Sequence, residues 1–134
     1  MATDKNKVIK LAALTQTPIS PDQIAGIGFC EEPECGDQMW IYIAVRNQMI
    51  IGAYCNVTKT ACTPLKAAAN AAISLIIDKP VMSAYAVNHE KIAGLLSDDG
   101  AVDKEHIHCT MMAELTLKKC IKDFATKKNY LKTL

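Results

Sequence analysis

The sequence has few aromatic side chains, almost no net charge and no long apolar run. Aromatic residues make up only 5% of the 134 residues, so we expect an aliphatic core of Ile, Leu, Val, Ala and Met. A net charge of +1 argues against nucleic-acid binding, which usually requires a concentrated basic face. No stretch approaches the ~18 apolar residues of a membrane span, and the charged residues 1–7 do not lead into the apolar run of a secretory signal. We therefore expect a cytoplasmic protein with neither nucleic-acid nor membrane partners.

Cysteine, by contrast, is abundant. Half of the residues are hydrophobic and 22% are charged, which is typical of a globular domain at this length. The chain contains six cysteines. Without a secretory signal, they favour metal or redox chemistry over a disulfide framework. The positions of these thiols are therefore the first guide to function.

The N-terminal part of the chain is expected to be separate from the domain that follows. Residues 4–14 suit a short helix, which Pro18 and Pro21 end. Because this helix is short and has little to hold it, residues 1–22 are predicted to form a mobile N-terminal segment. Residues 23–134 are predicted to form a single domain.

The first half of that domain has the pattern of a β-sheet. Three strands are predicted, at residues 24–30, 37–45 and 49–58, with a tight turn at residues 46–48. The residues expected on one face of the second strand are Met39, Ile41, Ile43 and Val45, and those on one face of the third are Ile51, Ala53, Cys55 and Val57.

The second half has the pattern of helices. A helix is predicted over residues 63–77, one or two short helices over residues 82–96, and a final helix from near Cys109 onward. The expected packing residues of the later helices are Tyr85, Ile92, Leu95, Leu96, Met112, Leu115, Cys120, Ile121 and Phe124. Strands followed by helices predict an α+β fold, in which an antiparallel three-stranded sheet carries the helices on one face.

Three of the cysteines fall at predicted element boundaries. Cys35 precedes a strand, whereas Cys62 and Cys109 each precede a helix. A thiol at a helix N-terminus is stabilised as thiolate, the form that binds soft metals and accepts sulfur. Asp37 and His108 add an oxygen and a nitrogen ligand close to these thiols. The spacing alone matches no zinc-ribbon pattern, so buried and inert cysteines remain an alternative at this point.

The same residues resemble a known family. Cys35-Gly36-Asp37, the lone Cys62 before a helix, and Ile107-His108-Cys109-Thr110 resemble the three-cysteine signature of the IscU/NifU-type iron–sulfur cluster assembly scaffolds. The similarity runs from about Gly28 to Phe124 in the same order and at nearly the same intervals. Lys7-Val8-Ile9 also resembles part of that family's mobile N-terminal helix.

The resemblance implies a scaffold and not a turnover enzyme. Such a protein receives sulfur from a cysteine desulfurase, builds a labile [2Fe–2S] cluster and passes it to apo iron–sulfur acceptor proteins. By the same resemblance, Cys35, Cys62 and Cys109 supply the cluster thiolates, and Asp37 or His108 supplies the fourth ligand. A stable cluster usually has four thiolates, so a carboxylate or imidazole in one position would make the cargo easier to release.

Other partners and other functions also follow from the comparison with that family. The family's Leu-Pro-Pro-Val-Lys segment for an Hsp70-type chaperone is replaced here by residues 102–106, so docking to that chaperone is not favoured. Lysines between residues 118 and 132 form either a solvated helix face or a docking patch for an acidic partner such as a ferredoxin; a frataxin-like protein is a further candidate. The rival functions are a zinc protein of the same fold, with Zn²⁺ at the same ligands, and a persulfide-accepting sulfur relay. Both a monomer and a homo-oligomer are compatible with three thiolates per chain.

The remaining cysteines and histidines are predicted to be mostly structural. Cys30, Cys55 and Cys120 are interpreted as small hydrophobic residues. Cys30, only five residues before Cys35, is a candidate auxiliary thiol, and Cys55 could be another if the end of its strand borders the site. His106 could share a face with His108 if the two residues lie in extended chain. His89 is predicted to be a surface residue without a partner.

Overall fold

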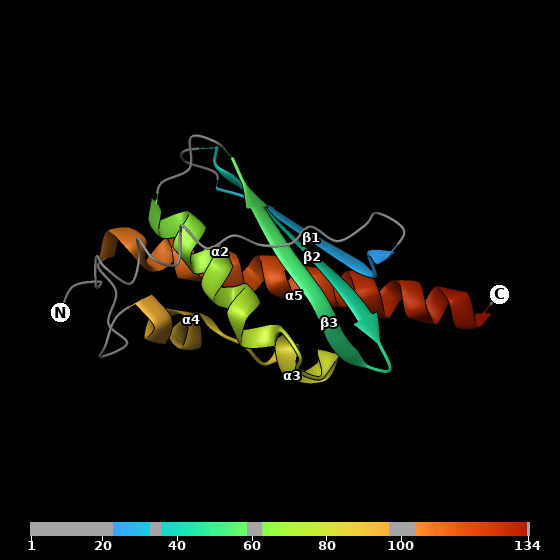
Figure 1. Cartoon of the computed structure of the whole chain (residues 1–134). Helices are drawn as coiled ribbons and strands as arrows, with labels where there is room; N and C mark the ends of the chain where they lie inside the picture. Colours follow the sequence, from blue (N-terminus) through green and yellow to red (C-terminus); the bar gives the residue numbers. More distant parts are fainter. Residues whose placement is uncertain (1–22, 33–35, 59–62, 97–103, 134) are drawn as a thin grey trace.

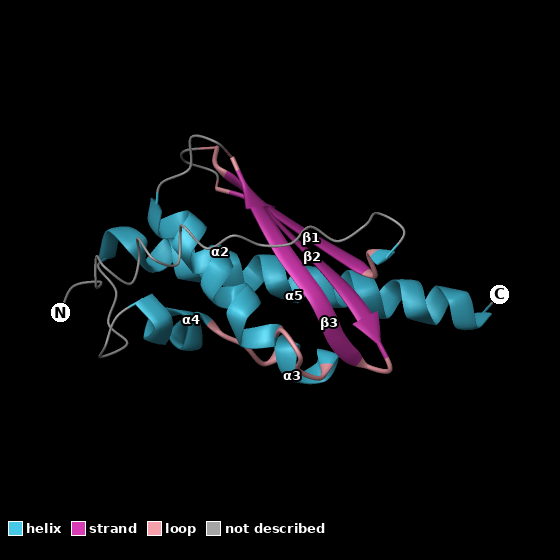
Figure 2. Ribbon diagram, viewed as in Figure 1, coloured by secondary structure: helices cyan, strands magenta, loops and turns pink. Residues whose placement is uncertain are grey.

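The computed structural model of the protein describes residues 23–32, 36–58, 63–96 and 104–133. Strands β1 (Gly26–Glu31), β2 (Gln38–Arg46) and β3 (Met49–Val57) form an antiparallel sheet in the order β1-β2-β3. Helices α2 (Thr63–Ile76), α3 (Val81–Tyr85), α4 (His89–Leu96) and α5 (Lys104–Thr133) follow. They lie on one side of the sheet (Figures 1 and 2). The predicted α+β fold is confirmed, whereas the predicted N-terminal segment 1–22 lies outside the described residues.

The inner face of the sheet forms one side of the core. Met39, Ile41 and Ile43 of β2 are completely buried, as the alternating pattern predicts. Asn47 and Gln48 form the turn into β3, and both have positive φ angles, 52° and 67°. Two consecutive positive φ angles are typical of the tight hairpin turn that matches strand twist.

The predicted phase of β3 is wrong at its beginning. Val45 pairs with Ile50 and Ala44 pairs with Gly52, so Ile51 lies between two successive pairs. This bulge turns Ile50 into the core, while Ile51 is 55% exposed. Beyond the bulge, Ala53 is buried and Cys55 and Val57 pack against the core, in agreement with the predicted phase.

The helices pack closely because α2 has small side chains. Its five completely buried alanines are Ala67, Ala68, Ala69, Ala71 and Ala72. Alanine favours the helix and leaves little side chain between α2 and its neighbours, and α2 contacts both β3 and α5. The helix ends before Asp78, whose φ of 60° leaves the helical region. The Asp78 N–H then donates to the Ile50 carbonyl at 2.9 Å, which joins the end of α2 to β3.

Helix α5 covers the otherwise free edge of β1. The Ile27 N–H donates to Asp123 Oδ2 at 2.9 Å, and Lys119 Nζ donates to the Phe29 carbonyl at 3.4 Å. These contacts satisfy backbone groups that an edge strand would otherwise present to another chain. On the outer sheet face, Phe29 packs against Trp40, and Tyr42 stacks on Tyr54.

Three further predictions about packing are corrected. Leu115 and Tyr85 were expected to be packing residues, but their side chains are 50% and 36% exposed. His89 does have a partner: its N–H donates to Glu114 Oε1 at 2.9 Å, and its Nδ1 lies 3.4 Å from the same oxygen. The Glu114 carboxylate, which accepts from the first residue of α4, stabilises the N-terminus of that helix. Within the described ranges, no helix has both the length and the apolar character that a membrane crossing requires.

Candidate metal centre

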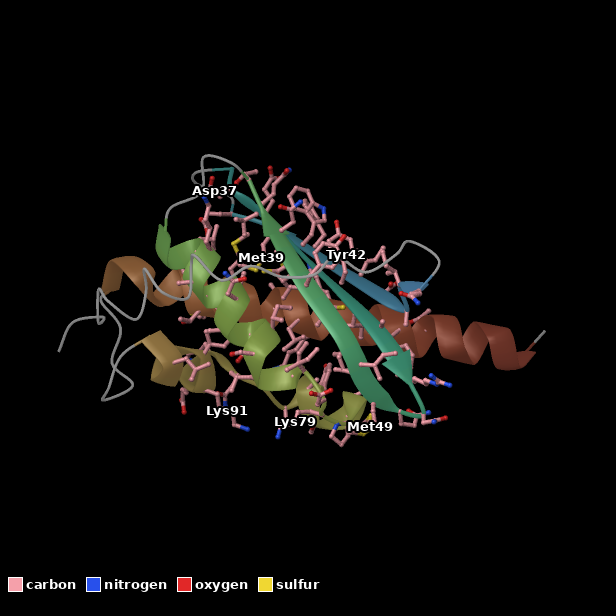
Figure 3. The ribbon with its side chains drawn as sticks, viewed as in Figure 1. Asp37, Met39, Tyr42, Met49, Lys79 and Lys91 are labelled. Atoms are coloured by element: carbon pink, nitrogen blue, oxygen red, sulfur yellow. The ribbon has the colours of Figure 1, made fainter. Side chains whose placement is uncertain are left out.

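The candidate site is built on the open end of the β2–β3 hairpin. Because β2 and β3 are antiparallel, the start of β2 and the end of β3 lie side by side, and Met39 pairs with Val57. Asp37 immediately precedes β2 and Thr58 immediately follows β3. Asp37 therefore lies at the end of the sheet opposite the turn next to Met49 (Figure 3).

Hydrogen bonds fix Asp37 and Thr58 relative to each other. The Thr58 N–H donates to the Gln38 carbonyl at 3.1 Å, and the Gln38 N–H donates to Thr58 Oγ1 at 3.3 Å. The Thr58 hydroxyl then donates to Asp37 Oδ1 at 3.1 Å. The Asp37 carboxylate is thus held by a side chain that lies 21 residues away in the sequence.

The loop that carries Cys35 is closed at its two ends. The Glu32 N–H donates to the Asp37 carbonyl, and the Gly36 N–H donates to the Glu32 carbonyl, both at 2.8 Å. Gly36 has a φ of 77°, which favours glycine. Cys35 itself lies outside the described residues, but these bonds hold the backbone on both sides of it next to Asp37.

Cys62 also lies outside the described residues, immediately before α2. The backbone of α2 begins at Thr63, as the Thr63-Pro64 sequence predicts. The last part of β3 contacts this helix directly, because Cys55 Sγ donates to Asn70 Oδ1 at 3.3 Å. Cys55 is therefore half-buried and hydrogen-bonded, and not simply a small hydrophobic residue. The buried Asn70 amide is a polar group that the sequence analysis did not identify.

The prediction that the final helix starts near Cys109 is wrong. Helix α5 begins at Lys104, so Cys109 lies inside it and its exposed fraction is 0%. The effect of the helix dipole falls off within the first turn, so this position gives less thiolate stabilisation than expected. His106 and His108 are also helical, and residues two apart in a helix point about 200° apart around its axis. They do not share a face as an extended pair would, and their side chains lie outside what the structure describes.

Cys30 is buried next to α5. It lines a cavity of about 550 Å³ between β1 and α5, together with Met111, Met112 and Leu115 on the apolar side. Glu31, Glu32 and Glu114 also line this cavity. Cys120 is completely buried in the core, as predicted.

The described side chains do not by themselves assemble a metal centre. Among them, no group of three or more His, Cys, Asp or Glu residues could hold one ion. The assignment of Cys35, Asp37, Cys62, His108 and Cys109 as ligands, with Cys30 and His106 as auxiliary groups, stays a prediction. The residue that the sequence analysis missed is Thr58. Its only sequence signal is its place at the end of the strand that pairs with β2.

Comparisons with known proteins show which family the chain is similar to. Residues 15–130 match the family model of the NifU-like N-terminal domain. The chain is 32% identical over 108 residues to the iron-sulfur cluster assembly scaffold protein IscU of Buchnera aphidicola, covering 81% of this chain and 80% of that protein. It is 28% identical over 102 residues to the scaffold protein IscU 1 of Archaeoglobus fulgidus, covering 76% of this chain and 63% of that one.

Solved structures show the same fold at lower sequence identity. A scaffold protein for the SUF system from Fervidobacterium islandicum superposes with a TM-score of 0.70 at 16% identity, covering 88% of this chain and 96% of that chain. The N-terminal part of a NifU-like protein from Brucella abortus gives 0.67 at 12% identity, covering 92% and 94%. The predicted resemblance to the IscU/NifU-type scaffolds is thereby confirmed, and the chain belongs to the family of NifU-like N-terminal domains.

Proposed function

We propose that this chain is an iron–sulfur cluster assembly scaffold that receives sulfur, builds a labile [2Fe–2S] cluster and transfers it to acceptor proteins. The observation that carries the proposal is the family match over residues 15–130, which contains all three signature cysteines. The protein acts as a carrier and not as a turnover enzyme. Its partners are a cysteine desulfurase, which supplies sulfur, and apo-proteins, which accept the cluster.

The geometry of the hairpin end supports this function. Asp37 is anchored beside the closed loop that contains Cys35. Cys62 is the residue before α2, and α2 packs against both β3 and the helix that contains Cys109. Three thiolates with one oxygen or nitrogen ligand suit iron or zinc. Such a set holds a cluster less permanently than four thiolates do.

Anaerobic reconstitution tests the proposal. The protein is incubated with iron, cysteine and a cysteine desulfurase, and cluster formation is followed by visible absorption and by iron and sulfide content. We expect a coloured protein, and loss of the colour in Cys35→Ser, Cys62→Ser and Cys109→Ser. Cys120→Ala is the matched control, because Cys120 of α5 is buried in the hydrophobic core and is not one of the proposed ligands. A colourless protein with stoichiometric zinc would favour the zinc or sulfur-relay function instead.

The role of Asp37 is tested by cluster transfer. If this carboxylate is the exchangeable ligand, Asp37→Ala should slow release of the cluster to an apo-acceptor. Glu31→Ala, which removes a nearby carboxylate at the end of β1, is the control. Unchanged transfer kinetics in Asp37→Ala would assign the fourth position to another group, such as His108.

A further inference from the structure

We infer that Thr58 is a positioning residue that sets how the Asp37 carboxylate meets a metal. This inference rests on the proposed function, because Asp37 acts in it as the exchangeable ligand. It is carried by the hydrogen bond of 3.1 Å between Thr58 Oγ1 and Asp37 Oδ1. Thr58 belongs to none of the cysteine or histidine motifs.

The direction of this hydrogen bond is fixed by its neighbours. A threonine hydroxyl has a single proton to donate. Thr58 Oγ1 already accepts from the Gln38 N–H at 3.3 Å, so that donor approaches a lone pair of the oxygen. A carboxylate oxygen can only accept when ionised, and the hydroxyl proton therefore points to Asp37. A hydrogen bond to an ionised acceptor is among the stronger ones in proteins.

The backbone also prevents the two residues from moving apart. The Thr58 N–H donates to the Gln38 carbonyl at 3.1 Å, and the Asp37 carbonyl accepts from the Glu32 N–H at 2.8 Å. The hydroxyl and the carboxylate are thus held on the ends of two adjacent, hydrogen-bonded chain segments. Ordering both main chains in this way lowers the entropic cost of the side-chain contact.

This arrangement makes Oδ1 a shared atom. A metal that binds Asp37 through both oxygens competes with the Thr58 hydroxyl for Oδ1, whereas binding through Oδ2 alone leaves the hydrogen bond in place. Thr58 therefore favours a carboxylate that binds through one oxygen and exchanges readily. Without the hydroxyl, the carboxylate can take the metal through two oxygens and releases it more slowly.

The test is a thermodynamic and kinetic cycle. Thr58→Val keeps the side-chain shape and removes the hydroxyl, whereas Thr58→Ser keeps the hydroxyl. Co²⁺ titration, followed by its visible absorption, measures metal affinity without any cluster chemistry, and transfer to an apo-acceptor measures release. We expect Thr58→Val to bind Co²⁺ more tightly and to transfer the cluster about tenfold more slowly, the scale of one hydrogen bond to a charged group.

Two controls separate positioning from general damage. Thr58→Ser should restore both values to those of the unaltered protein. In the Asp37→Ala background, Thr58→Val should change neither value further, because its effect passes through the carboxylate. Thr116→Val removes a buried hydroxyl that bonds to the Met112 carbonyl at 2.7 Å, and should leave Co²⁺ affinity unchanged.

The outcomes distinguish this inference from the proposed function. If Thr58→Val shifts Co²⁺ affinity equally with and without Asp37, Thr58 does not act through the carboxylate and the inference is wrong. The same conclusion follows if the cluster forms and transfers but Thr58→Val behaves as the unaltered protein. If no cluster forms in the unaltered protein, the proposed function fails, while the Co²⁺ cycle still tests the Thr58–Asp37 coupling.

Discussion

At the scale of single residues, the stacked pair Tyr42 and Tyr54 makes the outer face of the sheet sensitive to alkaline pH. Their ring centroids lie 4.5 Å apart with an interplanar angle of 12°. Burial, and then the charge of Tyr54, raise the pKa of Tyr42 above its usual 10.0. The folded protein therefore holds this proton more tightly than the unfolded chain does. The stabilisation is complete below pH 10 and is lost as the pH rises through the higher, folded-state pKa.

Tyr42→Phe should reduce this pH dependence. Because phenylalanine carries no phenolic proton, its free energy of unfolding should fall less steeply above pH 10 than that of the unaltered protein. Urea unfolding at a series of alkaline pH values measures the slope. Lysines titrate in the same range, so Tyr85→Phe, which leaves the stacked pair intact, is compared at each pH. Equal slopes in all three proteins would contradict the assignment to Tyr42.

The burial of Cys109 makes a second prediction at the residue scale. With an exposed fraction of 0%, its thiol should react slowly with an alkylating reagent in the native protein. Cys55 is half-buried and should react faster, whereas Cys30 and Cys120 should be slow like Cys109. Differential alkylation followed by peptide mass spectrometry gives the rates, and urea should make all four equally reactive.

The order of these alkylation rates matters for sulfur transfer, because persulfide formation requires access to the thiolate. Slow labelling of Cys109 would mean that docking of a desulfurase must open its surroundings before Cys109 can accept sulfur. If Cys109 is alkylated in the native protein as fast as Cys55, α5 opens readily around it without a partner.

At the scale of elements, the crossing of β1 and α5 depends on the absence of a side chain at Gly28. A Cβ at this position would clash with the Thr116 carbonyl and lie 2.7 Å from the Cys120 amide nitrogen. Both atoms are helix backbone and cannot move aside cheaply. Gly28→Ala should therefore destabilise the protein by at least 1–3 kcal/mol, roughly the cost of overpacking a core.

Gly94→Ala is the matched control for this substitution. Gly94 lies in α4, where an added Cβ meets nothing within 4 Å. Because alanine favours a helix interior over glycine, this variant should gain about 1 kcal/mol. Urea unfolding of both variants checks the prediction. A neutral Gly28→Ala would show that β1 and α5 can separate at no cost.

The elements also show what the sequence could and could not predict. Alternation identified the inward residues of β2, and Thr63-Pro64 and residues 78–80 identified both ends of α2. The bulge at Ile51 has no such signal, because Ile50 and Ile51 are equally apolar and only pairing with β2 decides between them. The early start of α5 was missed because the prediction places the motif around Cys109 before the helix, although Asp103 is a residue type favoured at an N-cap. The prediction that His106 and His108 share a face in extended chain is wrong for the same reason, since both lie in α5.

At the scale of the whole molecule, the sequence predicted the order of the layers but not the contacts between distant segments. Thr58 is opposite Gln38 only because the bulge shifts the register by one residue. Counting outward from the Asn47-Gln48 turn without the bulge pairs Gln38 with Val57 instead. The cysteine motifs identified the family because their order along the chain can be read from the sequence alone. The hydrogen bond that holds Asp37 exists only after the hairpin has closed.

Metal binding is also expected to depend on the folding of the whole chain. The proposed ligands belong to the loop before β2, the residue before α2 and helix α5, which are far apart in the sequence, so one ion could bind all of them only in the folded chain. An ion that binds this set should stabilise the fold, by about 2.7 kcal/mol at 100 times its dissociation constant. For a chain of this length that corresponds to a rise in Tm of roughly 10 °C.

Adding Zn²⁺ to the metal-free protein should therefore raise Tm in a thermal scan, and a chelator should reverse the rise. Cys35→Ser and Cys62→Ser should lose most of the gain, whereas Cys120→Ala should keep it relative to its own metal-free form. Zinc binding to cysteines of the unfolded chain reduces the rise in Tm. This reduction is similar in the three variants, since each of them lacks one of the six cysteines. If all variants gained equally, Zn²⁺ would be bound elsewhere, and the three thiolates would not form one centre.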